Sequence, residues 1–159
     1  MNKFIILLVI YLFLSCSIKR EKSFIGKQNH HKTFSLNKDV TDSLMLSWND
    51  MLKASNINSK IVEINIQNDI DLKTKKQYYK IFGKTNNDSA KVACLLELKN
   101  GKFYFEKGNV SKTVICHGSS NCKPEMYEGQ WVCNDGSKTP SCSLNCQKKV
   151  VAVFNENYR

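Results

Sequence analysis

The chain has 159 residues, of which 42% are hydrophobic, and 24 lysines and arginines against 14 acidic residues give it a formal net charge of +10. This length is enough for one domain of ordinary size, and the positive charge favours acidic partners such as phosphorylated lipid head groups or acidic polysaccharide. The lysines are spread along the whole chain, and Arg20 and Arg159 are the only arginines. The distribution is typical of a solvated surface rather than of one basic site.

The first segment has the pattern of a secretory signal. Behind Lys3, residues Phe4 to Leu14 form an eleven-residue apolar run, which is shorter than the roughly 20 residues of a membrane-spanning helix. The run ends at Leu14-Ser15-Cys16, which resembles the lipobox of bacterial lipoproteins. The resemblance implies that residues 1–16 are a signal peptide and that Cys16 is lipidated, with fatty acyl chains such as palmitate. Export argues against a nucleic-acid partner.

A second cleavage pattern overlaps the first. Ser15-Cys16-Ser17 satisfies the small-x-small rule of ordinary signal peptides, which would place the cut after Ser17 and release the chain. A freely secreted protein is therefore the alternative to a lipid-anchored one.

Residues 17–38 are polar and show no sustained periodicity, so we expect a flexible tether between the anchor and the folded part. The tether contains His30 and His31. Two adjacent histidines on such a segment are expected to be solvated rather than bound to metal.

A helix is predicted from Asp39 to about Ser55. Asp39 or Thr41 can cap it, because short polar side chains accept hydrogen bonds from the first free N–H groups of a helix. One apolar stripe at helical spacing indicates the buried face: Leu44, Trp48, Met51 and Leu52.

Five strands are predicted after the helix, from period-two alternation and from turn signals. Asn100-Gly101 favours a type I′ hairpin turn, and Gly108-Asn109 favours a type II′ turn. Val62, Ile64 and Ile66 are expected on one face of the first strand. The predicted strands are Lys60–Gln67, Gln77–Lys84, Ser89–Lys99, Lys102–Lys107 and Val110–Cys116.

These elements predict an α+β domain over residues 39–116, with the N-terminal helix covering one face of an antiparallel meander. The order of elements resembles the cystatin-like layout over Asp39–Cys116. The glycine and Gln-x-Val-x-Gly features of inhibitory cystatins are absent from the sequence. The resemblance therefore concerns the fold and does not extend to protease inhibition.

The two hairpin registers exclude one disulfide. The first hairpin places Cys94 opposite Lys107, and the second places Cys116 opposite Gly101. The resulting six-residue offset is roughly 20 Å along a strand, whereas bridged Cα atoms lie within about 7 Å. Cys94 is thus expected either to reach a cysteine of the C-terminal segment or to remain a buried free thiol.

Residues 117–159 are expected to form a cysteine-rich, loop-rich module packed on the domain. With Cys16 lipidated, six cysteines remain, and an even number in an exported chain predicts a disulfide framework. Fifteen pairings are possible, and the sequence does not choose among them. The end of the segment, Lys148–Phe154, looks like a strand that returns to the sheet edge. The disulfide candidates are Cys94, Cys116, Cys122, Cys133, Cys142 and Cys146.

No metal site, cofactor or catalytic activity is expected. Zinc modules use paired Cys-x-x-Cys turns, and no such turn occurs in this chain. His117 lies beside Cys116, but neighbouring residues of a strand point to opposite faces, which does not suit a Cys/His dyad. One enzymatic alternative stays open: a hydrolase with paired carboxylates drawn from Glu97, Glu106, Glu125 and Glu128.

The whole layout resembles small envelope lipoproteins of Gram-negative bacteria. The resemblance implies a lipid-anchored, non-catalytic protein of the outer or inner membrane, whose disulfide-stapled module binds an envelope protein or an acidic glycan. Tyr127 and Trp131 are expected as exposed aromatic residues of that module. The alternative is a freely secreted, disulfide-rich inhibitor or effector.

Overall fold

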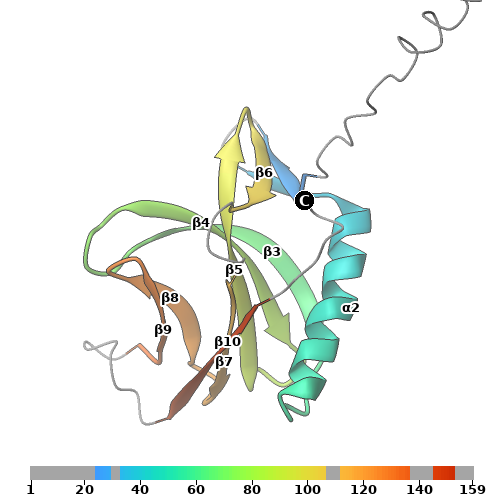
Figure 1. Ribbon diagram of the computed structural model, residues 1–159, viewed down its shortest axis with the longest axis vertical. Helices are drawn as coiled ribbons and strands as arrows, with labels where there is room; N and C mark the ends of the chain where they lie inside the picture. The colour runs from blue at the N-terminus through green and yellow to red at the C-terminus, as the bar shows by residue number, and fades with distance from the viewer. Residues whose placement is uncertain (1–23, 30–32, 107–111, 137–144, 153–159) are drawn as a thin grey trace, which may run out of the picture.

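The structure is a computed structural model that describes residues 24–29, 33–106, 112–136 and 145–152. Within these residues it has one helix and ten strands, of which eight form one antiparallel sheet and two form a separate hairpin. Figure 1 shows the helix on one side of the sheet and the hairpin on the other. The elements are β1 (Gly26–Gln28), β2 (Phe34–Leu36), α2 (Lys38–Ala54), β3 (Ile61–Ile70), β4 (Gln77–Thr85), β5 (Ala90–Lys99), β6 (Lys102–Phe105), β7 (Lys112–Gly118), β8 (Lys123–Tyr127), β9 (Gln130–Asn134) and β10 (Cys146–Ala152).

Strand β5 is the centre of the sheet because it pairs with three other strands. One edge pairs with β4, from Lys91 opposite Lys84 to Leu96 opposite Tyr79. The other edge is shared, since β7 pairs with the first half of β5 and β6 with the second half. The sheet continues from β6 to β1 and β2, from β7 to β10, and from β4 to β3.

The expected fold class, an N-terminal helix packed on an antiparallel meander in cystatin-like order, is wrong. The described chain is mostly antiparallel β-structure with one helix; β7 pairs with β5 instead of β6, and β1 and β2, which precede the helix, join the sheet beyond β6. Strand β6 has only 4 residues against 10 in β5. It leaves the backbone groups of the first half of β5 unpaired on that edge, and buried backbone groups require partners. Strand β7 supplies them.

The first hairpin register is confirmed and the second is wrong. Asn100 and Gly101 have φ values of 50° and 73°, as a type I′ turn requires, and Leu96 lies opposite Phe105. Cys116, however, lies opposite Lys91 rather than Gly101. The predicted turn at Gly108-Asn109 falls outside the described residues.

Helix α2 forms where it was predicted, but its cap lies one half-turn earlier. The Asn37 side chain accepts a hydrogen bond from the Asp39 N–H at 3.2 Å, so Asn37, and not Asp39 or Thr41, is the N-cap. Trp48 is 1% exposed and packs closely on Gly83, where a Cβ atom would lie 2.6 Å from the indole ring. The residues buried along the helix are Val40, Leu44, Trp48 and Leu52.

A β-bulge changes the expected facing of the first residues of β3. The register shifts between Ile61 and Glu63, so Val62 is the extra residue and is 55% exposed. Ile61 takes the buried position instead and is 3% exposed. The sequence alternates regularly from Val62 to Ile66, and for that reason the alternation did not reveal the bulge.

Part of the expected tether, 17–38, belongs to the folded sheet. Strand β1 pairs with both β2 and β6, and Ile25 is fully buried, with its N–H donating to the Phe103 carbonyl at 2.7 Å. Each of these strands has 3 residues, too few for a visible alternation. Residues 1–23, including the expected signal peptide and Cys16, lie outside the described part of the chain.

Two separate clusters of apolar side chains form, one on each face of the sheet. Along β5, Val92 and Cys94 belong to the cluster under the helix, whereas Ala93 belongs to the cluster under the β8–β9 hairpin. This follows from the opposite directions of successive side chains in a strand. The sheet thus has a packed cluster on both faces, and the cysteine-rich segment covers the face away from the helix.

Candidate functional site

The β8–β9 hairpin is joined to the sheet by two disulfides. Cys116 of β7 is bridged to Cys133 of β9, and Cys122, just before β8, is bridged to Cys146 at the start of β10, with Cα–Cα distances of 5.5 and 5.6 Å. The expectation of disulfides is confirmed for these four cysteines. Cys94 is free and buried, and Cys142 lies outside the described residues. We call β8, β9 and their two bridges the stapled hairpin.

The absence of a Cys94–Cys116 bridge has a different reason from the predicted one. Cys94 lies in the cluster under the helix, and Cys116 lies in the cluster under the stapled hairpin. The sheet itself separates the two sulfur atoms. Burial raises the pKa of the Cys94 thiol to about 12.

The bridge to β10 depends on a glycine. Gly118 has a φ of +131° and lies opposite Cys146, and a Cβ atom there would be 2.0 Å from the carbonyl oxygen of Asn145. Only glycine permits both this backbone conformation and this approach. Strand β10 therefore runs along β7 from its first residue, which confirms that the C-terminal strand returns to the sheet edge.

Trp131 is buried, which corrects the expectation that it is exposed. It is 7% exposed and packs edge-to-face on Tyr78, with ring centroids 6.2 Å apart. Its neighbours in the cluster include Met126 of the same hairpin and Val114 of β7. Trp131 thus anchors the stapled hairpin on the sheet, whereas Tyr127 is half-buried at its turn.

A buried lysine connects the sheet to the stapled hairpin. Lys80 is 2% exposed, forms an ion pair with Asp69 at 2.8 Å, and donates to the Pro124 carbonyl at 2.8 Å. Its ammonium also lies 5.9 Å and 5.5 Å from the ring centroids of Tyr78 and Phe82. These partners offset the cost of removing the charge from water.

Asp71 joins two loops at the end of the molecule away from the helix. Its Oδ1 accepts from the N–H groups of Lys73, Thr74 and Glu128 at 2.9, 2.8 and 3.2 Å, and its Oδ2 accepts from the Gly129 N–H at 2.8 Å. The hydrogen bonds, led by the one from Thr74, hold the pKa of Asp71 far below its usual range. The β3–β4 loop and the β8–β9 turn therefore form one rigid unit, residues 71–76 and 127–130, which we call the tip.

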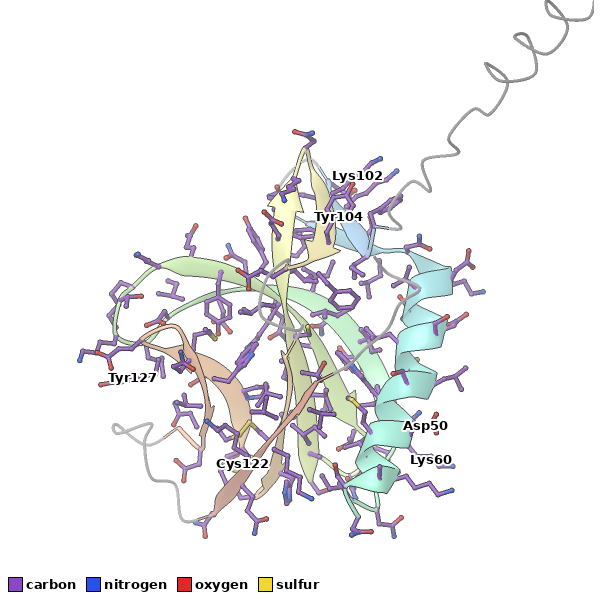
Figure 2. The ribbon with its side chains drawn as sticks, in the orientation of Figure 1. Asp50, Lys60, Lys102, Tyr104, Cys122 and Tyr127 are labelled. Atoms are coloured by element: carbon purple, nitrogen blue, oxygen red, sulfur yellow. A yellow bond between two sulfur atoms is a disulfide. The ribbon has the colours of Figure 1, made fainter. Side chains whose placement is uncertain are left out.

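The tip presents a lysine against an aromatic ring. Lys73 forms an ion pair with Glu128 at 2.5 Å, and its ammonium lies 5.7 Å from the Tyr127 ring centroid. The hydrogen bond and charge of Glu128 raise the pKa of Lys73. Lys75 and Lys76 are exposed in the same β3–β4 loop. In Figure 2, Tyr127 marks this end of the molecule, far from Asp50 and Lys60 at the helix.

His117 and Cys116 do not form a nucleophilic pair. The Cys116 sulfur is consumed by its disulfide, and the two residues occupy successive positions of β7, whose side chains point to opposite faces. Burial, together with the nearby Lys149, lowers the pKa of His117.

The four glutamates of the hydrolase alternative have separate surroundings. Glu97 pairs with Lys99 at 2.6 Å, Glu125 accepts from the Asn134 amide at 2.6 Å, and Glu128 pairs with Lys73. Glu106 is exposed at the end of β6. Among the residues that the structure describes, no group of three or more His, Cys, Asp or Glu side chains could hold a metal ion.

Sequence reasoning missed Asp71 and Lys80. Asp71 heads the polar segment Asp71-Leu72-Lys73-Thr74, and an aspartate that accepts from N–H groups two and three residues ahead is a common turn signal. That signal indicates the local turn but not its bonds to residues 128 and 129. Lys80 stands in the predicted strand Gln77–Lys84, and no local pattern distinguishes it from an exposed lysine.

Comparison with known proteins adds no relative. No protein-family model matches the chain, and neither the curated proteins nor the solved structures contain a significant match. Over the described residues, the single helix falls short of the length and apolar character needed to cross a membrane.

Proposed function

We propose that the protein is a lipid-anchored, non-catalytic component of the bacterial cell envelope, held through Cys16 in the outer or inner membrane, and that its stapled hairpin presents a partner-binding surface. The observation that carries the proposal is the pair of disulfides, because such bridges persist in oxidising compartments outside the cytoplasm. The sequence Leu14-Ser15-Cys16 supports the anchor. Several acyl chains on one residue hold a protein durably, whereas one chain is marginal.

The tip is the part of the stapled hairpin that suits a partner. Asp71 holds its two loops in one arrangement, so little conformational entropy is lost when a partner binds. Lys73, Lys75 and Lys76 outnumber the single exposed acid, Glu128. This charge favours an acidic glycan or the acidic face of an envelope protein.

The anchor is tested with Cys16→Ala in the producing bacterium. We expect the variant to move from the membrane fraction to the soluble fraction, and mass spectrometry of the wild-type chain to show acylated Cys16 at its N-terminus. Ser17→Leu is the matched control, because it removes only the small residue required by ordinary cleavage and leaves the protein on the membrane. Unchanged release of Cys16→Ala into the medium, with processing blocked by Ser17→Leu, would instead establish the freely secreted alternative.

The partner surface is tested with a triple variant of the tip, Lys73→Gln, Lys75→Gln and Lys76→Gln. Alginate oligosaccharide serves as the acidic glycan probe, and a photo-crosslinking residue at position 76 serves as the probe for envelope proteins in living cells. We expect the triple variant to weaken at least one interaction about tenfold or more, in a salt-dependent manner. The control replaces three exposed lysines elsewhere, Lys38, Lys53 and Lys60, by glutamine. Equal alginate binding by both triples, with no crosslink at position 76, contradicts this surface.

A further inference from the structure

A groove lies on the helix-side face of the sheet, between the β1–β2 pair and the β3–β4 pair. Its volume of about 520 Å³ falls within the roughly 300–1,000 Å³ of small-ligand sites. Ile66 and Tyr79, which line it, belong to the cluster under the helix, so the groove is on the opposite face from the stapled hairpin. The other lining residues are Gln28, Phe34, Gln67, Asn68, Asp69 and Gln77.

Two aromatic rings in the groove are held rigidly. Phe34 meets Tyr79 edge-to-face with centroids 6.0 Å apart, and both rings pack against Phe103 at 5.4 and 5.2 Å. Phe103 is fully buried. Phe34 and Tyr79 remain half-buried, so each is fixed from below while part of it stays accessible from the groove.

Three amide side chains on the groove face lack partners of their own. Within the described part of the chain, the side chains of Gln28, Asn68 and Gln77 make no hydrogen bond. Asn68 and Gln77 are exposed and Gln28 is half-buried, whereas Gln67, opposite Lys80, points to the other face of the sheet. Each amide offers two donors and one acceptor. The groove thus presents paired donors and acceptors in several directions.

The groove carries little net charge. Asp69 is the one acidic residue among its lining residues, and its carboxylate points to the opposite face of the sheet, where Oδ2 is paired with the Lys80 ammonium at 2.8 Å. No lysine, arginine or histidine is among the lining residues. A phosphate or carboxylate would therefore find no cation, and an acyl chain would leave the amides unpaired, which is costly for buried polar groups.

A saccharide satisfies all of these features. Its neighbouring hydroxyl groups both donate and accept, as the amides do, and the C–H face of a sugar ring is apolar and can pack on an aromatic side chain. We propose that this groove binds a neutral saccharide chain. The site is independent of the anchor and of the lysines of the tip, so either proposal can fail without the other.

The experiment uses the purified full chain and three neutral probes: cellohexaose, maltohexaose and chitohexaose. Binding is followed by saturation-transfer NMR and by titration calorimetry. We expect at least one hexasaccharide to bind, and the double variant Asn68→Ala/Gln77→Ala to bind it at least tenfold more weakly, since two hydrogen-bonding groups are lost. Gln130→Ala/Gln147→Ala removes two exposed strand amides outside the groove and is expected to bind as the wild type does.

The charge of the ligand separates this site from the tip. Binding of a neutral hexasaccharide is expected to be unchanged between low and high salt, whereas alginate binding at the tip weakens with salt. Both double variants carry surface changes, and their circular dichroism and thermal midpoints are compared with the wild type to verify folding. The proposal is overturned if none of the three probes binds at millimolar concentration, or if the groove and control variants bind equally.

Discussion

At the scale of single residues, two buried charges are kept because each is surrounded by matching groups. Lys80 has a carboxylate, a carbonyl and two aromatic rings around its ammonium. Asp71 has four backbone N–H groups around its carboxylate. An unpartnered charge at either position would destabilise the fold strongly. The same hydrogen bonds that stabilise the two buried charges also connect the sheet and the β3–β4 loop to the stapled hairpin.

Asp71 makes the stability of the protein depend on pH in acid. Its pKa is lowered in the folded state, chiefly by the hydrogen bond from Thr74, so the ionised carboxylate stabilises the fold above the unfolded-state pKa of about 3.9. That contribution is lost as the pH falls below this value toward the lower folded-state pKa.

We expect Asp71→Asn to lower the free energy of unfolding at pH 7 and to reduce its decrease between pH 4 and 2. The wild-type and variant curves then converge in acid. Urea unfolding at pH 7, 4, 3 and 2 measures this, with the exposed Asp42→Asn as control. Parallel curves for wild type and Asp71→Asn would show that the four hydrogen bonds do not depend on the charge.

At the scale of elements, the stapled hairpin is held by covalent bonds as well as by packing. Strands β8 and β9 have 5 residues each, and an isolated two-stranded hairpin is at best marginally stable in water. The bridges close segments with sequence separations of 17 and 24 residues. One bridge joins the end of the hairpin that precedes β8 to β10, and the other joins β9 to β7.

Removing either bridge is expected to lower the free energy of unfolding by about 2–4 kcal/mol. The chain-entropy difference between the two loops is only about 0.3 kcal/mol, so a larger difference between the two bridge variants would come from packing rather than from loop length. Cys116→Ala/Cys133→Ala is expected to cost more, because both of its sulfur atoms lie in the buried cluster and a cavity is left. Urea unfolding of both variants measures the costs.

A reductant provides the control for the bridge variants. It is expected to bring the wild-type chain to or below the stability of either variant, because both bridges are then open. A wild-type chain whose unfolding midpoint does not change on reduction contradicts a stabilising role for the bridges.

At the scale of the whole molecule, one sheet carries a packed cluster on each face. Strand β5 contributes to both, with Cys94 under the helix and Ala93 under the stapled hairpin. Loss of the hairpin uncovers only one face of the sheet. The helix-side cluster can therefore persist when the other is disturbed, as expected for regions of unequal local stability.

Cys94 reports on the helix-side cluster. Burial raises the pKa of its thiol from 9.0 to about 12, which lowers the reactive thiolate fraction about a thousandfold. We expect Cys94 to resist iodoacetamide at pH 8 until the protein is unfolded in urea, and to stay protected in Cys122→Ala/Cys146→Ala. Mass spectrometry in a Cys142→Ser background measures the labelling. Rapid labelling of the bridge variant without urea would show that both clusters open together.

Local signals predicted the elements that depend on neighbouring residues. The apolar stripe located α2, and Asn100-Gly101 located a hairpin with the register observed. Short elements without such a signal were missed: β1 and β2 have 3 residues each, and the bulge at Val62 lies within a regular alternation. Three residues are too few for a period to be recognised, and one extra residue within an alternating strand leaves no signal in the pattern.

The candidate sites depended on contacts that no local pattern contains. Asp71 meets residues 128 and 129 more than fifty positions away, and the groove joins amides from β1, β3 and β4. The alternation of β9 is the same whether Trp131 faces solvent or Tyr78. Only the docking of the stapled hairpin decides that it is buried.

The sequence by itself determined the helix, most strand positions and the first hairpin register, because these follow from residue type and from spacing within about ten residues. The tertiary structure alone decided that β7 pairs with β5, which cysteines are bridged, and which face of the sheet each reaches. The physical reason is that the edges of all strands expose the same backbone groups, so the N–H and C=O groups of one edge can form hydrogen bonds with any other strand. The choice between partners is made by burial on both faces of the sheet at once, and that requires the whole chain to be in place.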